Sequence, residues 1–566
     1  MRSEWRVLLL LFAAIFGVLL VLHAPFLRLP YFWDEAGYYI PAALDFYRHH
    51  LLIPHDTLPT GHTPLVMIYL GAVWRLFGFG TLATRTAMIL IAAAAVLVTF
   101  LLGRRVAGTE TGLWSALLLA LSPLFFAQSS LVFLDLTAAL FTTLAVLFIL
   151  DERWLRFAVA ASAALMSKET AVVMLPVVWA FLWPSRKERR KSVWLAALAP
   201  LAPLAAWAVY YHHATGFWTG NATYLKYNLY ATLTPLHILR GLLARLGEVF
   251  VQGFNWIATT AALLGLWRLR KQKQSMDEAA SSIAPLNGAS SLSFRGVAVS
   301  PELRREESRK ILHFRARFLA ELGIGLPGKR LRQCGGFLRG ETNRRPGFAF
   351  LAIGLILVYL VMLSLVGGAI LPRYLLPVFP VFYVGAATLA ARLPRTAARA
   401  LMLVAVACFI SSWFINPPYP FPYEDNLAYS DFVRLHQQAA NFLEALPGNP
   451  VILTAWPATD ELRSPFLGYV THPLRVAAVS DFRPADLRNL PHFDVLYLYS
   501  RQWDPGDNLL SPRSPLITRL RRFFEYRPAM PPRALATRFH LALLRQFTRR
   551  GQWVRIYTVE GDDFGR

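Results

Sequence analysis

Seven side chains with acid, base or phenol chemistry lie beside apolar runs, in five stretches that are far apart in the sequence. They are Asp34 and Glu35, His62, Asp135, Lys168, and Arg373 with Tyr374. A positioned carboxylate can act as a general base toward a hydroxyl or an amine. Lysine and arginine can hold a phosphate and stabilise it as a leaving group. These residue types therefore predict a reaction that uses an anionic, phosphate-bearing substrate and removes a proton.

Each of these residues also has a structural alternative. The two adjacent carboxylates can cap an interfacial helix, because carboxylates favour helix N-termini, and Asp135 can do the same at a membrane edge. Lys168 can extend its amine to the interface, Arg373 can bind lipid headgroups, and His62 can be structural. Ionisable side chains at membrane depth are costly and are functional candidates by default. Because such residues occur in five separate stretches of the sequence, the functional interpretation is favoured.

The composition indicates that these residues belong to a membrane protein. The chain has 566 residues, of which 55% are hydrophobic and 16% charged, and its mean hydropathy is +0.40. Soluble proteins contain about 25% charged residues. The net charge of +24 could indicate nucleic-acid binding. However, lysine and arginine gather in loops between apolar runs, as they do in membrane proteins, so we expect no nucleic-acid partner.

Apolar runs long enough, or nearly long enough, to cross a bilayer predict about eleven spans. Crossing takes about 20 mostly apolar residues. The runs lie at 7–26, 83–103, 112–130, 131–150, 157–167, 170–184, 193–211, 248–267, 347–367, 375–391 and 400–416. The first run has no clear small-residue cleavage site, which predicts a retained span. The two cysteines predict neither a disulfide framework nor a cysteine-based metal site.

Basic clusters set the predicted orientation, because basic loops stay in the cytoplasm. They follow the second, fourth, sixth, eighth and tenth spans, at 104–105, 153–156, 186–191, 268–273 and 392–399. This alternation predicts a multi-pass protein of the inner (plasma) membrane with a cytoplasmic N-terminus. All five stretches with candidate site residues then lie on the side away from the cytoplasm.

The predicted domains are a transmembrane domain over 1–416 and a small extracytoplasmic α/β domain over 417–566. The first contains an outer loop at 27–82 and a basic cytoplasmic loop at 268–346, in which 275–294 is predicted to be disordered and 301–322 to form a basic helix. In the second, short apolar runs near 451, 474, 494 and 554 alternate with helix-like stretches, a pattern typical of α/β domains.

Spaced motifs over about 5–415 resemble the GT-C superfamily of membrane glycosyltransferases. The most similar branch holds the protein O-mannosyltransferases and the lipid A aminoarabinose transferases. The motifs are Trp33-Asp34-Glu35, His62-Thr63-Pro64-Leu65, the Asp135 that opens the fourth span, Ser167-Lys168-Glu169 and Arg373-Tyr374-Leu375-Leu376-Pro377. Two positions depart from the family pattern. Thr63 replaces the first proline of the usual pair, and His62 stands where the aminoarabinose transferases have lysine.

The resemblance implies an all-α membrane bundle that transfers one sugar, with inversion, from a polyprenyl-phosphate donor. The acceptor would be a glycan, lipid or protein outside the cytoplasm. Asp34 would act as base or acceptor organiser, with Glu35 beside it, and Asp135 would orient a cation or the acceptor. The donor phosphate would be held by Lys168, Arg373, Tyr374 and His62. No cofactor would be obligatory, although a divalent cation is possible.

Two other functions use the same features. A transporter or flippase of lipid-linked sugars would also carry buried charges, although transporters usually place them near mid-membrane and show inverted repeats. An O-antigen-ligase-like polysaccharide transferase would use a diphosphate donor instead of a monophosphate.

Overall fold

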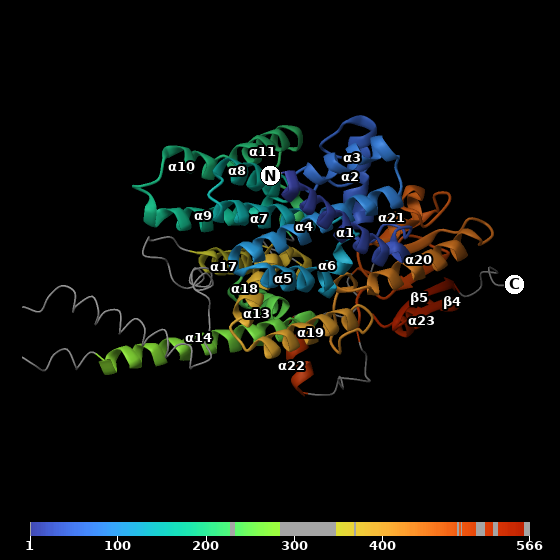
Figure 1. Cartoon of the computed structure of the whole chain (residues 1–566). Helices are drawn as coiled ribbons and strands as arrows, with labels where there is room; N and C mark the ends of the chain where they lie inside the picture. The colour runs from blue at the N-terminus through green and yellow to red at the C-terminus, as the bar shows by residue number, and fades with distance from the viewer. Residues whose placement is uncertain are drawn as a thin grey trace, which may run out of the picture.

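The computed structural model describes residues 2–226, 233–283, 347–366, 369–483, 486–487, 490–504, 515–524 and 530–559. Helices dominate up to residue 412, and a five-stranded sheet forms near the C-terminus (Figure 1). The helices of the first part are α1 (Arg2–His23), α2 (Ile40–His49), α3 (Leu65–Phe77), α4 (Thr81–Ala107), α5 (Thr109–Leu121), α6 (Pro123–Gln128), α7 (Leu134–Leu150), α8 (Trp154–Ser167), α9 (Met174–Leu182), α10 (Lys191–Leu198), α11 (Leu201–Thr215), α12 (Ala222–Leu225), α13 (Pro235–Phe250), α14 (Asn255–Ile283), α17 (Phe348–Leu365), α18 (Phe379–Ala390) and α19 (Arg395–Ser412).

The helical bundle predicted from the apolar runs is confirmed, because every run falls on one or two consecutive helices. Within the described residues, six helices are long and apolar enough to cross a membrane. The number is seven if the bent pair Pro235–Phe250 and Gln252–Ser275 forms one span, and shorter apolar helices such as Leu134–Leu150 accompany them. The count of eleven spans and the orientation stay predictions.

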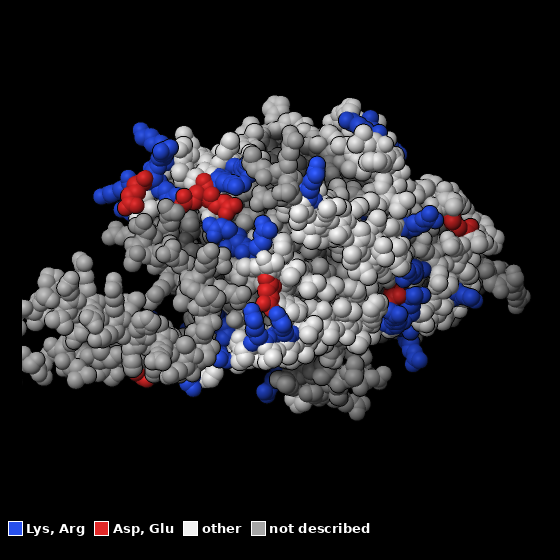
Figure 2. All heavy atoms as spheres, viewed as in Figure 1, with Lys and Arg blue, Asp and Glu red and all other residues white. Residues whose placement is uncertain are grey.

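The outer surface of the bundle is suited to lipid. On α1, the side chains of Leu10, Val18 and Val21 are exposed by 71%, 60% and 73%. Water would oppose such exposure, whereas hydrocarbon favours it. Figure 2 shows a broad area with few charges over this part of the molecule, whereas lysines and arginines gather beside α8–α10 and over the C-terminal domain.

Small residues bring α4 and α5 close together. A Cβ on Gly103 would lie 2.8 Å from the Cα of Gly112, so neither position has room for a larger side chain. Small residues allow close helix approach in membrane proteins, where packing replaces the hydrophobic driving force. This tight pair fixes α4, whose first turns carry Arg85.

The basic segment 268–346 differs in part from its prediction. Helix α14 continues to Ile283, so the predicted disorder at 275–294 is wrong for its first residues. The helix continues because Met276 to Ala280 contains good helix formers and no glycine or proline. The basic helix predicted at 301–322 lies outside the described residues.

The C-terminal sheet is mixed, with strand order β2-β1-β3-β5-β4. Its strands are β1 (Ile452–Ala455), β2 (Val476–Val479), β3 (Val495–Tyr499), β4 (Leu541–Arg549) and β5 (Gln552–Val559). The first three are parallel, whereas β5 runs antiparallel to β3 and β4. Helices α20 (Ala428–Glu444), α21 (Ala458–Arg463), α22 (Pro515–Phe523) and α23 (Pro532–Phe539) accompany it. The predicted α/β character is confirmed, although the edge strand β4 was not predicted.

The C-terminal domain packs directly on the segment 27–82 that follows α1. Tyr469 Oη donates a hydrogen bond of 3.0 Å to the carbonyl of Tyr31, and the amide of Tyr31 donates one of 3.2 Å to the carbonyl of Leu467. The indoles of Trp33 and Trp456 meet edge to face with centroids 5.2 Å apart. One hydrophobic core includes side chains from both parts, so the domain helps to shape this segment.

Gly37 provides a test of this packing. A Cβ at this position would lie 2.6 Å from Trp456 Nε1. We expect Gly37→Ala to destabilise the protein by about 1–3 kcal/mol, the usual cost of overpacking, and to expose the 417–422 linker to protease. Thermal unfolding and limited proteolysis in detergent would measure both effects. Gly17→Ala is the control, because its Cβ meets no atom within 4 Å, and equal stability of the two variants would contradict the contact.

Candidate active site

Arg373 lies between two carboxylates that come from different parts of the chain. It belongs to the 3-10 helix η9 (Pro372–Val378), which leads into α18, and its side chain is 1% exposed. Nη2 pairs with Asp34, and Nη1 lies 2.5 Å from Oε2 of Glu424. Asp34 comes directly before the π-helix η2 (Glu35–Tyr39). Charge-assisted pairs of this kind are the strong hydrogen bonds in proteins.

Lys168 forms the second buried cation pair. It lies in extended backbone where α8 ends and the 3-10 helix η3 (Glu169–Val173) begins, which confirms the break predicted there. Its Nζ is 2.6 Å from Oδ1 of Asp135, in the first turn of α7, and both side chains are buried. Lysine and aspartate are rarely buried unless they are paired.

The ring of Tyr374 contacts the cations of both pairs. Lys168 Nζ lies 4.1 Å from the ring centroid, and Arg373 Cζ lies 5.3 Å from it. The ring of Phe133 also lies 4.1 Å from Arg373 Cζ. We call Asp34, Asp135, Lys168, Arg373, Tyr374 and Glu424 the site cluster. It brings together four of the five stretches predicted from the sequence, and the 3-10 helix η10 (Tyr423–Asp425) adds Glu424 from outside them.

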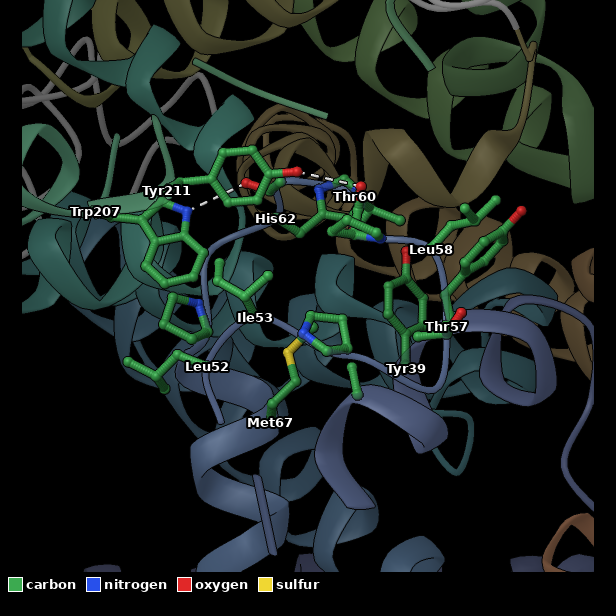
Figure 3. A pocket seen from close by; sticks show the side chains of 16 residues that line it. Tyr39, Leu52, Ile53, Thr57, Leu58, Thr60, His62, Met67, Trp207 and Tyr211 are labelled. Carbon is green, nitrogen blue, oxygen red and sulfur yellow. Dashed lines mark hydrogen bonds between the residues drawn. The ribbon is translucent and has the colours of Figure 1, made fainter. Parts of the chain in front are cut away.

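His62 lies beside the site cluster. Its Nδ1 is 2.9 Å from Oε1 of Glu169, the residue after Lys168, and its ring is 6.1 Å from that of Tyr39. Figure 3 shows a pocket lined by His62, Tyr39, Trp207 and Tyr211. The pocket wall is fixed by hydrogen bonds from the Trp207 indole to the carbonyl of Gly61 and from the Tyr211 hydroxyl to the carbonyl of Pro59, both 3.2 Å.

Glu35 points away from the site cluster. Both of its oxygens pair with the Arg85 guanidinium, at 3.1 and 3.2 Å, and both side chains are fully buried. The same oxygens accept the backbone N–H groups of Phe32 and Val132. Arg85 also donates to the carbonyls of Pro30 and Ser130. The pair therefore ties the loop before Asp34 to the segment before Asp135.

Trp33 further fixes the position of Asp34. Its φ of 53° lies in the left-handed region, which is costly for a residue with a large side chain. The indole is held by edge-to-face contacts with Phe432 and Trp456 of the C-terminal domain. Strained backbone of this kind persists only where the surroundings stabilise it, and it is common at functional sites.

Glu424 is a site residue that the sequence analysis missed. It lies in the 3-10 helix η10 (Tyr423–Asp425), directly after the proline-rich segment 417–422. Burial raises the pKa of its carboxyl to about 7, against the lowering influence of the Arg373 guanidinium. The acidic pair Glu424-Asp425 directly after the prolines is the sequence signal that could have identified it as a candidate. Only the fold shows that it returns to Arg373.

Each carboxylate of the site cluster lies against a side-chain cation, and Arg373 is shared by two of them. Among the described residues, no group of three or more His, Cys, Asp or Glu side chains is arranged to hold a metal ion. Asp34 and Asp135 instead face Arg373 and Lys168. The arrangement offers positive charge to an incoming anion directly from the protein.

Comparison with protein families gives a match over the first part of the chain. The profile of the family described as dolichyl-phosphate-mannose-protein mannosyltransferase matches residues 61–210. This range contains His62, Asp135 and Lys168. No curated protein sequence matches the chain.

Comparison with solved structures gives matches over nearly the whole chain. The crystal structure of ArnT from Cupriavidus metallidurans bound to undecaprenyl phosphate has a TM-score of 0.50 and 13% identity, covering 98% of each chain. The apo structure of that protein has a TM-score of 0.48 and 15% identity, with the same coverage. Oligosaccharyltransferase AglB from Archaeoglobus fulgidus has a TM-score of 0.43 and 13% identity, covering 99% of this chain and 75% of AglB.

The family profile and the ArnT structure with bound undecaprenyl phosphate support the resemblance to GT-C glycosyltransferases that the sequence motifs predicted. The family profile supports it over 61–210, and the ArnT structure shows that the fold is shared along the chain.

Proposed function

We propose that this protein is an inverting glycosyltransferase that moves one sugar from a polyprenyl-phosphate donor to an acceptor outside the cytoplasm. The main support is the site cluster, in which Lys168 and Arg373 flank one tyrosine ring and each pairs with a carboxylate. This cluster combines two phosphate-binding cations with a candidate base. The matched family profile and the ArnT fold, solved with undecaprenyl phosphate, agree with such a donor.

The donor phosphate would exchange places with the carboxylates on the two cations. Lys168 would leave Asp135. The guanidinium N–H groups of Arg373 that pair with Asp34 would donate to the phosphate oxygens instead. Both cations sit in a buried environment, where electrostatic stabilisation of a leaving group is much stronger than in water. The apolar helix surfaces of the bundle would accommodate the polyprenyl chain.

Asp34, released from Arg373, would then act as the base. The acceptor oxygen or nitrogen attacks the anomeric carbon on the face opposite the phosphate, and its proton passes to a carboxylate oxygen of Asp34. The bond between the anomeric carbon and the phosphate oxygen breaks, and the polyprenyl phosphate leaves with the bonding electrons. One displacement inverts the anomeric configuration.

The other candidate residues support this step in our proposal. Glu35 positions Asp34 through its pair with Arg85. His62 lines the pocket beside the cluster, so we place it near the transferred sugar and not on the phosphate. Tyr374 holds the two cations at a fixed separation.

Lys168→Met is expected to weaken donor binding by about 10- to 100-fold, because hydrogen bonds to charged groups contribute about 1.5–3 kcal/mol. Binding of undecaprenyl phosphate to the purified protein in nanodiscs would measure this change. Lys271→Met in the exposed part of α14 is the control, since its amine contacts the Trp267 ring, far along the chain from the site. Unchanged affinity in the Lys168 variant would contradict its phosphate role.

Sealed proteoliposomes would test the function itself against transport. A panel of hexosyl and pentosyl undecaprenyl phosphates would be supplied with candidate acceptors on the side of the C-terminal domain. Covalent transfer with release of undecaprenyl phosphate supports the enzyme. Movement of the donor across the bilayer without covalent transfer would overturn the proposal in favour of a flippase.

A further inference from the structure

We propose that Glu424 is a positioning residue of the donor-phosphate site, so that the segment leading into the C-terminal domain completes a site otherwise built by the helical bundle. This inference rests on the proposed function. It assigns a role to a residue outside the stretch whose sequence motifs resemble the glycosyltransferases, which ends near 415.

Glu424 is held firmly from two sides. On the bundle side, Gln128 of α6 donates a hydrogen bond of 3.1 Å to its carbonyl, and Gln252 donates one of 2.5 Å to the neighbouring Asp425. On the sheet side, the Tyr423 hydroxyl lies 2.8 Å from the hydroxyl of Ser500. Helix η10 is therefore a rigid connection between the two parts, and it presents the Glu424 carboxyl at a fixed place.

The contact between Glu424 and Arg373 leaves polar atoms unused. Arg373 Nε and Glu424 Oε1 are both buried and have no hydrogen-bond partner among the described residues. Buried polar atoms without partners are uncommon and costly in a purely structural pair. The free Nε can donate to an anionic oxygen, and the free Oε1 can carry a proton. Both features suit a site that is completed by a ligand.

The charges around Glu424 favour its neutral form when a phosphate is bound. Arg373 faces it from η9, Asp34 from the segment 27–82, Asp135 from α7 and Asp425 from η10 itself. Glu248 of α13 acts on Asp425. The carboxylates outnumber the single cation that Glu424 contacts. A bound phosphate adds further negative charge.

Protonation of Glu424 would therefore help Arg373 to take the phosphate. With a proton, Glu424 still positions the guanidinium by a hydrogen bond but no longer competes as an anion. With its pKa raised by burial to about 7, the carboxyl passes from mostly neutral at pH 6 to mostly ionised at pH 8. The fraction of the protein in which Glu424 is neutral, and which binds the phosphate well, then falls about tenfold. The apparent Kd for the polyprenyl phosphate rises by the same factor.

The test measures binding of undecaprenyl phosphate to the full chain in nanodiscs at pH 6 and pH 8. Because a phosphate monoester itself titrates near pH 6, Glu424→Gln serves as the neutral reference. We expect wild type to match this variant at pH 6 and to bind about tenfold more weakly at pH 8. Glu424→Ala should bind about tenfold more weakly than Glu424→Gln at both pH values, because a charge-assisted contact that positions Arg373 is lost.

Glu461→Gln is the matched control. Its carboxyl group is also buried beside a basic side chain, 2.5 Å from His436 Nδ1, but inside the C-terminal domain. This variant should lower the thermal midpoint and keep the wild-type pH dependence. If it alters the pH dependence as Glu424→Gln does, the effect belongs to the domain as a whole and the assignment is overturned.

The outcomes separate this inference from the proposed function. If the wild type binds undecaprenyl phosphate with the same pH dependence as Glu424→Gln, the role of Glu424 is overturned and the proposed function is not. Equal affinity of the alanine and glutamine variants overturns the role of Glu424 in the same way. Folded wild type that fails to bind undecaprenyl phosphate at either pH overturns the proposed function, and the assignment with it.

Discussion

Asp34→Asn is expected to lower the rate of sugar transfer by about 10²- to 10⁴-fold, the usual contribution of a general base. Asparagine keeps the shape of the side chain but cannot accept the acceptor proton. Arg373 retains its second partner, Glu424, 2.5 Å away, so the protein should insert and fold as wild type does. Transfer assays with the donor panel and thermal unfolding in detergent would measure the two properties separately.

Asp45→Asn is the control for this experiment. Asp45 lies in α2 of the same segment 27–82 and is buried, and among the described residues its Oδ2 accepts the backbone N–H groups of His55 and Asp56 and faces no cation of the site cluster. This variant should retain transfer. Full activity of Asp34→Asn would show that another group takes the proton, and the proposed mechanism would be wrong.

Glu35→Ala is expected to destabilise the protein by about 3–5 kcal/mol, because it leaves the Arg85 charge buried without its partner. Two backbone N–H groups, of Phe32 and Val132, also lose their acceptor. The thermal midpoint and the yield of folded protein should both fall. The double variant with Arg85→Met should lose less stability than the sum of the two single changes, since it removes both charges together.

This experiment separates two roles for adjacent acidic residues. The sequence predicts a catalytic role for Glu35 beside Asp34, whereas the buried pair with Arg85 supports a positioning role. A Glu35→Ala variant that unfolds at the wild-type temperature and still loses transfer would favour the catalytic role. Loss of stability together with loss of activity, recovered in part by Glu35→Gln, would favour positioning.

Much of the fold could be predicted from local sequence patterns. Apolar runs predict the helices of the bundle because crossing hydrocarbon demands continuous apolar helix. The interruption at Ser167-Lys168-Glu169 predicts the break between α8 and η3, because two charges cannot lie in the middle of an apolar helix without partners. Strand β4 was missed because its residues alternate irregularly and remain largely exposed at the sheet edge.

The sequence by itself determined which residue types are available for chemistry: carboxylates, cations and a tyrosine beside apolar helices. Only the tertiary structure decided which of them meet. Asp34 and Glu35 are neighbours in the chain, yet the turn of η2 sends one to Arg373 and the other to Arg85. Glu424 reaches Arg373 from 51 positions away. Such pairings depend on the packing of distant segments, and no local spacing encodes them.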